Sequence, residues 1–199
     1  MSEKPAIDLD ALRSGDREQF ALMVDTYSTK IYRLALRMMG NEQEAEDILQ
    51  ETFLNAYRAL PKFEGRSNLG TWLYRIASNQ ALMRLRKKNP VSISVDDPIV
   101  DDEWDEIPRQ FVDWCCLPEN ELMTAEVFSE LDSALDTLSS NLRTVFILRD
   151  VNGLSTRETA QVLNISEAAV KTRLLRGRLK LREALSSYFS ERIEEIGYA

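Results

Sequence analysis

The side chains best suited to specific chemistry are the cations of residues 166–182. Six basic residues lie there and the only acid is Glu167, which gives this stretch a net charge of +5 in a chain of formal charge −8. The basic residues are Lys171, Arg173, Arg176, Arg178, Lys180 and Arg182. Between them, apolar residues recur at helical spacing. An amphipathic helix with solvated cations has the same pattern, so the basic stretch alone does not establish a ligand.

The residues before this stretch predict a tight turn between two helices. Ser155 precedes Glu158 by three residues, which is the spacing of a capping box at the start of a short helix. Asn164 then interrupts the pattern, and Asn is the non-glycine residue best suited to a left-handed turn. Ser166 caps the basic helix, with Glu167 in its first turn. The combination predicts a helix-turn-helix whose second helix contacts the base edges and phosphates of DNA.

The rest of the composition argues against catalysis. The 199 residues include no histidine, which excludes Ser-His and Cys-His nucleophiles and His-containing metal sites. The two cysteines are adjacent, Cys115-Cys116, and we expect reduced thiols, with a redox switch as the less favoured alternative. We therefore expect no metal, no cofactor and no enzymatic activity. No apolar run approaches the roughly 18 residues that span a membrane, and the acidic N-terminus does not resemble a signal peptide, so we expect a cytoplasmic protein.

Two groups of helices are predicted. In residues 6–90, apolar residues recur at three- and four-residue steps, and Asp16, Asn41 and Asn68 stand where helix N-caps are expected. A second group covers residues 119–187 and includes the helix-turn-helix. Residues 91–113 lie between them, with eight acids against Arg109 alone, a net charge of −7. We predict an all-α fold of two small helical domains, the C-terminal one a four-helix helix-turn-helix domain, joined by an acidic flexible linker.

Two helices of the first group have a polar face. The helix that ends near Leu60 has an acidic, amide-rich face, for which simple solvation is the alternative interpretation. The helix over residues 69–88 is expected to direct Trp72, Ile76, Leu82 and Leu85 inward. Its other face is predicted to carry Tyr74, Arg75, Asn79, Arg84, Arg86, Lys87 and Lys88. Aromatic, amide and basic residues beside a loop favour binding of unstacked single-stranded bases. Core packing is the alternative for Trp72 and Tyr74, and it is the preferred role for Trp72.

Three stretches in this order, EAEDILQETFLNAYRAL, FEGRSNLGTWLYRIASNQAL and the helix-turn-helix, resemble the extracytoplasmic-function sigma factors. These are promoter-specificity subunits of bacterial RNA polymerase. The resemblance implies that residues 6–90 are sigma region 2, 91–118 a linker, 119–187 sigma region 4 and 188–199 a C-terminal tail. It also implies the partners: the core RNA polymerase, through its β′ clamp helices and β subunit, promoter DNA, and an anti-sigma factor, without membrane insertion.

The same resemblance implies three sets of site residues. The set that docks on the core polymerase is Asp47, Gln50, Glu51 and Asn55. The set that reads and melts the −10 element is Phe63, Arg66, Ser67, Asn68, Trp72, Tyr74, Arg75, Asn79 and Arg84. The set that reads the −35 element is Ser166, Glu167, Ala168, Lys171, Thr172, Arg173, Arg176 and Arg178.

Two other functions fit parts of the sequence. A free-standing helix-turn-helix regulator would bind paired half-sites as a dimer, but the chain has no obvious dimerisation helix and residues 41–88 would have no role. An adaptor that binds only proteins would leave both basic surfaces solvated. It would show no salt-sensitive DNA binding, which separates it from the other two.

Overall fold

The computed structural model describes residues 7–88 and 125–196, and the side chains of residues 7–88 and 131–186. These residues form helices and no strand, which confirms the all-α prediction. The predicted linker and the Cys115-Cys116 pair lie outside the described residues. So do the first six residues of the predicted second domain and the last three of its tail.

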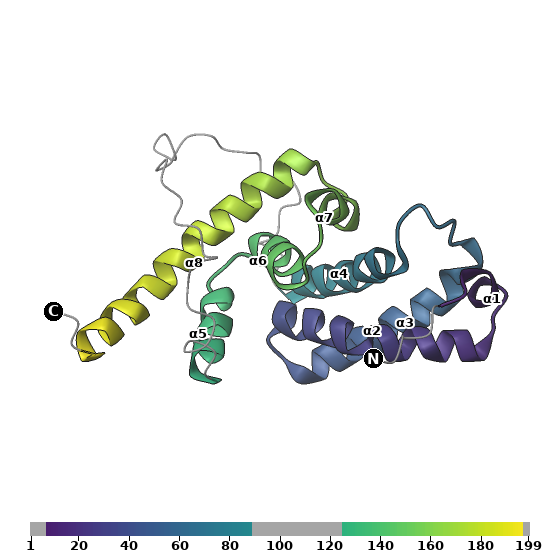
Figure 1. The fold of residues 1–199 in the computed structure, drawn as a ribbon, viewed down its shortest axis with the longest axis horizontal. Helices are drawn as coiled ribbons and strands as arrows, with labels where there is room; N and C mark the ends of the chain where they lie inside the picture. The colour runs from purple at the N-terminus through teal and green to yellow at the C-terminus, as the bar shows by residue number, and fades with distance from the viewer. Residues whose placement is uncertain (1–6, 89–124, 197–199) are drawn as a thin grey trace, which may run out of the picture.

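The first bundle consists of the four helices before residue 89 (Figure 1). They are α1 (Leu9–Arg13), α2 (Arg17–Met39), α3 (Glu42–Ala59) and α4 (Leu69–Lys88), with a 3-10 turn at Leu60–Lys62. The predicted caps are present: the side chain of Asp16 accepts from two amides of α2, and that of Asn41 accepts from the Glu44 amide. Gly40 ends α2 in the left-handed conformation, φ 66°, which glycine adopts without a steric cost.

The second bundle contains α5 (Ala125–Asp136), α6 (Ser140–Phe146), α7 (Thr156–Leu163) and the long α8 (Glu167–Ile196). A π-helical turn, Ile147–Val151, continues α6. Leu135, Leu138, Leu181 and Leu185 form one buried cluster, so α5 and α8 pack together through their apolar faces. The predicted four-helix domain is therefore confirmed, and α8 extends through most of the predicted tail (Figure 1).

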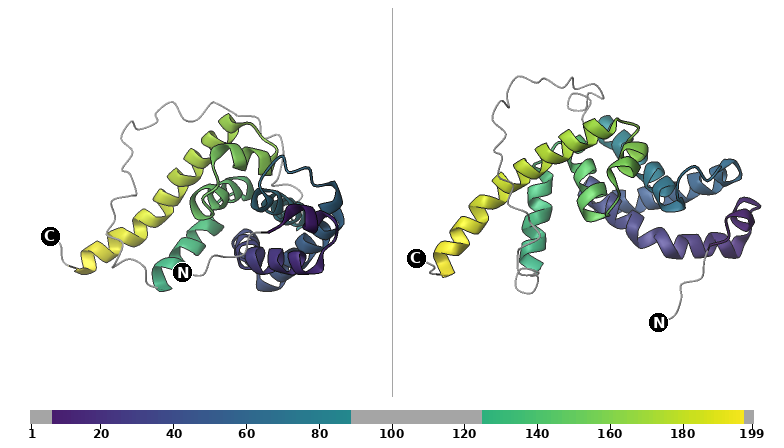
Figure 2. Two further views of the ribbon diagram at one scale, coloured as in Figure 1. Left: turned by 45° about the vertical axis from the view of Figure 1, so that its right-hand side comes forward. Right: turned by 45° about the horizontal axis from the view of Figure 1, so that its top comes forward.

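The two bundles are packed against each other, with α7 of the second bundle next to α4 of the first (Figure 2). Leu148, Leu154 and Val162 of the second bundle belong to the same buried cluster as Leu73 and Ala77 of α4. This contact therefore removes apolar surface from water on both sides, which is the main favourable term in such packing.

A polar contact lies at the edge of the same interface. Arg37 of α2 faces Asp132 of α5, with 3.8 Å between Nε and Oδ1. Because the Asp132 side chain is mostly exposed, this ion pair adds little stability. It marks where the interface between the bundles ends. Within the described ranges, no helix is both long and apolar enough to cross a lipid bilayer.

Candidate functional site

The helix-turn-helix is built from α7, a turn at Asn164 and α8. The Ser155 hydroxyl accepts from the Glu158 amide at 3.2 Å, and the Glu158 carboxylate accepts from the Ser155 amide at 2.8 Å, so the predicted capping box is present. Asn164 has φ 54° and is the one non-glycine residue with positive φ among those described. Ser166 accepts from the Ala169 amide and caps α8. Because both caps are local, the helix ends were predictable from sequence.

A small apolar cluster fixes the angle between α7 and α8. Ala160 of α7 packs with Val170 and Leu174 of α8 and with Val145 of α6, all of them buried. Alanine at the contact lets the two helix backbones approach closely, as the turn requires. The opposite side of α8 is thereby left at the surface.

The residues predicted to read duplex DNA lie on the first half of α8. Ser166, Glu167, Ala168 and Lys171 are exposed. Thr172, Arg173 and Arg176 are half-buried. In the part of the chain that the structure describes, Lys171 makes no ion pair, so its ammonium group is available to an anionic ligand.

Arg178 differs from the other cations of this set. Its Nε and Nη2 atoms donate to the two carboxylate oxygens of Asp150, each at 2.8 Å, in a two-pronged pair with the π-helical turn. This geometry satisfies the planar fork of the guanidinium group. Arg178 was predicted to be a DNA-facing cation, but in the structure it already has an anionic partner within its own domain.

The exposed face of α4 carries Arg75 and Asn79, as predicted. Residues at helical steps of four and then three continue this face to Met83 and Arg86. The Met83 side chain is 64% exposed, more than any other large apolar residue in the described ranges. Met83 was not among the residues predicted from the sequence, although its position four residues after Asn79 places it among the predicted DNA-facing residues.

Tyr74 is not on this face. It is buried at 7% exposure, on the side of α4 that also carries Leu73 and Ala77, so its predicted placement on the polar face was wrong. Burial raises the pKa of its hydroxyl, and the neighbouring Tyr27 raises it further. The inward side of α4 had been expected at Trp72 and Ile76, which are only half-buried. Both errors have one cause: α4 packs against three helices, α2, α3 and α7, so its buried side is broader than its own periodicity indicates.

Phe63 and Trp72 pack on each other at the edge of the same core. Their ring centroids lie 4.7 Å apart, Phe63 is 7% exposed, and Trp72 is half-buried. The Nε of Arg13 donates to the Phe63 carbonyl at 2.7 Å, so α1 fixes the start of the loop. The core role preferred for Trp72 agrees with this packing, and Phe63 shares it.

The loop between Phe63 and α4 carries the remaining predicted −10 residues. Arg66 is exposed and pairs with Glu64, and Ser67 is half-buried. Asn68 caps α4, because its Oδ1 accepts from the Thr71 amide at 2.6 Å. Its Nδ2 donates across the interface to Glu158 Oε1 at 2.9 Å. Asn68 therefore performs its predicted capping role and also joins the two bundles.

Glu158 occupies a central position that sequence analysis did not foresee. One of its oxygens serves the capping box, and the other accepts from Asn68 and from the Thr71 hydroxyl at 3.3 Å. The amide and hydroxyl of Ser155, followed by Asn68 and Thr71, lower the pKa of Glu158 against a smaller opposing effect of burial. The carboxylate is thus held ionised between the start of α4 and the start of α7.

The predicted docking residues lie on one side of α3. Asp47 and Glu51 are roughly half exposed, Gln50 is exposed and Asn55 is half-buried. Leu54, which is 50% exposed, stands three residues after Glu51 and four after Gln50. Leu54 therefore adds an apolar side chain to this acidic surface. It was not predicted, although an apolar residue on the polar face of a helix is a signal that the sequence contains.

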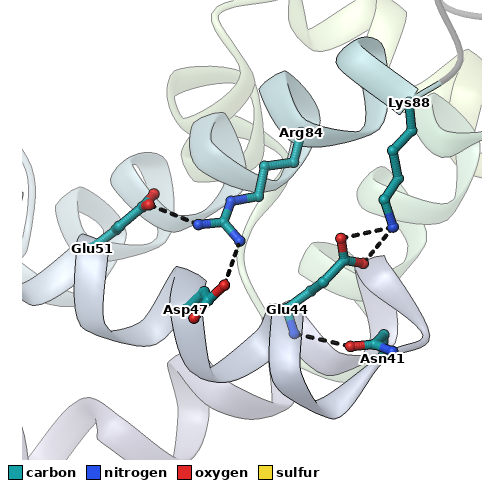
Figure 3. Close-up of polar contacts among 6 residues, drawn as sticks. All are labelled: Asn41, Glu44, Asp47, Glu51, Arg84 and Lys88. Atoms are coloured by element: carbon teal, nitrogen blue, oxygen red, sulfur yellow. Dashed lines mark hydrogen bonds and ion pairs between the residues drawn. The ribbon is translucent and has the colours of Figure 1, made fainter.

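Arg84 of α4 lies against this acidic side of α3 (Figure 3). Its Nη1 is 3.3 Å from Asp47 Oδ2 and its Nη2 is 2.7 Å from Glu51 Oε1. One turn further along α4, Lys88 pairs with Glu44 at 2.7 Å (Figure 3). The prediction that Arg84 shares a face with Arg75 and Asn79 was wrong, because five residues after Asn79 the helix has turned Arg84 toward α3.

Comparisons with known proteins agree with this architecture. The family model described as Sigma-70 region 2 matches residues 23–90, and the model described as Sigma-70, region 4 matches residues 128–181. The two matches fall on the first and second bundles. Two solved structures share the fold at a TM-score of 0.64: the sigma factor RpoE with the anti-sigma factor NepR from Bartonella quintana, and CnrH with the cytosolic domain of CnrY. They are 23% and 24% identical to this chain, cover 85% and 90% of it, and are themselves covered over 98% and 95% of their lengths.

Curated relatives match over nearly the whole chain. The extracytoplasmic-function sigma factor SigW of Bacillus subtilis is 39% identical over 174 residues, which are 87% of this chain and 92% of SigW. The RNA polymerase sigma-H factor of Pseudomonas aeruginosa is 33% identical over 183 residues, 92% of this chain and 94% of that protein. By these matches and by its two helical domains, the chain belongs to the extracytoplasmic-function sigma factors of RNA polymerase.

Proposed function

We propose that this sigma factor binds core RNA polymerase through α3, reads the −10 element with α4 and its preceding loop, and reads the −35 element with α8. The observation that carries the proposal is the distribution of charge over three helices of one chain. The acidic side of α3 suits a basic protein surface, whereas the exposed face of α4 and the first half of α8 present cations and amides. A chain of net charge −8 can therefore bind DNA at two separate surfaces.

We choose the proposed contacts among the predicted residues by their exposure. For the −10 element we propose Arg66, Ser67, Asn68, Arg75 and Asn79, which lie on the loop or on the outer face of α4. Phe63, Trp72 and Tyr74 support this surface from the core.

For the −35 element we propose the residues from Ser166 to Arg176, with Lys171 as a phosphate contact. Arg178 contributes mainly through its pair with Asp150, which ties α8 to the π-helical turn. For the core polymerase we propose Asp47, Gln50, Glu51 and Asn55, which lie on or beside one face of α3.

Three further properties belong to this proposal. The chain recognises promoters and leaves bond formation to the polymerase, it acts in the cytoplasm, and it is held inactive by an anti-sigma factor. The support for the last point is that RpoE and CnrH, which share its fold, were solved in complex with NepR and CnrY. A free-standing regulator is disfavoured, because the first bundle matches sigma region 2 and so has a role of its own.

Reconstitution tests the proposal. The full-length chain and purified bacterial core polymerase are incubated with a promoter library, and run-off transcripts are sequenced, with core polymerase alone as the control. We expect transcripts that start at defined sites only when the chain is present. Substitution of Arg173 and Arg176 by Ala should remove selection at the −35 element. A stable dimer that binds duplex half-sites and yields no such transcript would instead establish a free-standing regulator.

A further inference from the structure

Arg84 has the contacts of a residue that organises α3. Its guanidinium group spans two carboxylates one helical turn apart, Asp47 and Glu51, and its side chain is only 25% exposed (Figure 3). Burial alone would lower the pKa of Arg84, but the hydrogen bond and charge of Glu51, followed by those of Asp47, raise it. The group therefore remains a cation fixed between two anions.

The helical phase separates Arg84 from the DNA-facing residues of α4. Arg75 and Asn79 share the outer face with Met83, whereas Arg84 follows Asn79 by five residues and Arg75 by nine. At about 100° per residue, nine residues place Arg84 on the side opposite Arg75. A base held on the outer face would therefore lie away from the Arg84 side chain.

The arrangement leaves part of each carboxylate for a partner. Asp47 accepts a hydrogen bond from Arg84 through Oδ2, and Glu51 accepts one from Arg84 through Oε1. Among the described residues, Asp47 Oδ1 and Glu51 Oε2 make no hydrogen bond or ion pair, and both side chains are nearly half exposed. Without Arg84, two like charges four residues apart would repel each other and would sample several rotamers. With it, two acceptor oxygens are held ready for a basic surface, which reduces the ordering cost of binding.

We propose that Arg84 is a positioning residue of the polymerase-docking surface: it fixes the side chains of Asp47 and Glu51 so that their outer oxygens meet cations of the core enzyme. This inference rests on the proposed docking role of α3. It assigns Arg84 to protein binding and withdraws it from the set that contacts the −10 element.

Binding of the labelled full-length chain to purified core polymerase tests this assignment. We expect Arg84→Ala to weaken binding roughly tenfold, since two side chains lose their fixed orientation. Arg84→Lys should lie between that variant and the native chain, because an ammonium group lacks the fork that holds both acids. Lys88→Ala is the matched control: it removes one charge from the same helix and frees Glu44, which is outside the docking set, so binding should change by less than about twofold.

Two further measurements separate positioning from direct contact. In an Asp47→Asn, Glu51→Gln background, Arg84→Ala should weaken core binding no further, because the residues through which it acts are already neutral. At saturating core polymerase, its promoter affinity should equal that of the native chain. Helical circular dichroism checks folding, and if Arg84→Ala unfolds, Arg84→Lys is used for the same comparisons.

The opposite pattern would overturn the inference. Unchanged core binding with lost promoter affinity at saturating core polymerase would make Arg84 a DNA contact. An equal loss of core binding in the neutralised background would make it independent of Asp47 and Glu51. If the native chain itself fails to bind core polymerase, the proposed function fails, and the positioning role fails with it.

Discussion

Replacement of Glu158 by Gln should destabilise the protein by about 1.5 kcal/mol at pH 7. The native carboxylate accepts from the amide and hydroxyl of Ser155, from Asn68 and from Thr71. Glutamine has nearly the same shape but only one acceptor oxygen, so it can serve the capping box or the start of α4, not both. Loss of a cap costs about 1 kcal/mol, and a partly exposed hydrogen bond contributes about 0.5 kcal/mol more.

Thermal unfolding followed by circular dichroism measures this effect. For a chain of 199 residues, about 1.5 kcal/mol corresponds to a decrease in melting temperature of roughly 3–6 °C. Glu46→Gln is the matched control, since Glu46 is an exposed acid of α3 that makes no hydrogen bond or ion pair among the described residues. Its melting temperature should stay within about 1 °C of the native value.

The pH dependence gives a second, independent test. The pKa of Glu158 is lower in the folded protein than its usual 4.5, because the Ser155 amide and hydroxyl, Asn68 and Thr71 bind the ionised form, although burial opposes them. The stability that depends on this charge is therefore fully present above about pH 4.5 and lost as the pH falls through the folded value. The native protein and the Gln variant should thus converge in acid, and a gap that persists undiminished at pH 3 would refute the assignment of the effect to the carboxylate.

The contact between the bundles can be isolated with Asn68→Ser. Serine retains an oxygen that caps α4 but has no amide to donate to Glu158. In this background the cost of Glu158→Gln should fall by about 0.5 kcal/mol, which is the share of the interface contact. Additive effects of the two substitutions would show that Asn68 and Glu158 do not interact in solution.

Three further predictions concern separate parts of the structure. Asn164→Ala should destabilise the protein by about 1–2 kcal/mol and Asn164→Gly by much less, measured by urea unfolding, because φ at this position is positive. Gly70→Ala should cost about 1–3 kcal/mol, since the new Cβ would lie 3.0 Å from the Tyr27 ring, whereas Gly177→Ala, with its nearest neighbour at 3.7 Å, should be neutral or stabilising. Lys171→Ala should reduce the salt dependence of promoter binding by the reconstituted polymerase by about one unit of slope. An unchanged slope would argue against a phosphate contact.

Helix boundaries were predictable because their determinants lie within a few residues of each other. Asp16, Asn41, Ser155 and Ser166 each accept a hydrogen bond from an amide two or three residues later, as expected from sequence. The left-handed Asn164 is a local effect of the same kind. The helix-turn-helix and the starts of α2, α3, α7 and α8 could therefore be located from the sequence with little error.

The faces of α4 were harder to predict, because they depend on helices remote in the chain. Tyr74 is buried through packing in the first bundle, where Tyr27 of α2 is its neighbour, and periodicity within α4 does not reveal that. Arg84 forms ion pairs with two acids of α3, and the sequence did contain a signal for this contact. Asp47 and Glu51 are four residues apart, as are Arg84 and Lys88, and two consecutive helices joined by a short loop run antiparallel, which brings such pairs together.

The contact at Glu158 has a direct consequence for DNA recognition. While Nδ2 of Asn68 donates to Glu158 at 2.9 Å, only one of its two N–H groups is left for an unpaired base. A base that takes both N–H groups of Asn68 requires the start of α7 to move away from the start of α4 first. Loss of the hydrogen bonds between the bundles costs on the order of 1 kcal/mol, which is less than the binding free energy of a single stacked base. The apolar packing of Leu154 and Val162 against the first bundle must also be replaced. DNA alone would have to offset both terms, whereas a core polymerase that binds the bundles at separate positions would offset the packing term before DNA arrives. The interface between the bundles therefore favours promoter binding in the assembled enzyme over binding by the free chain.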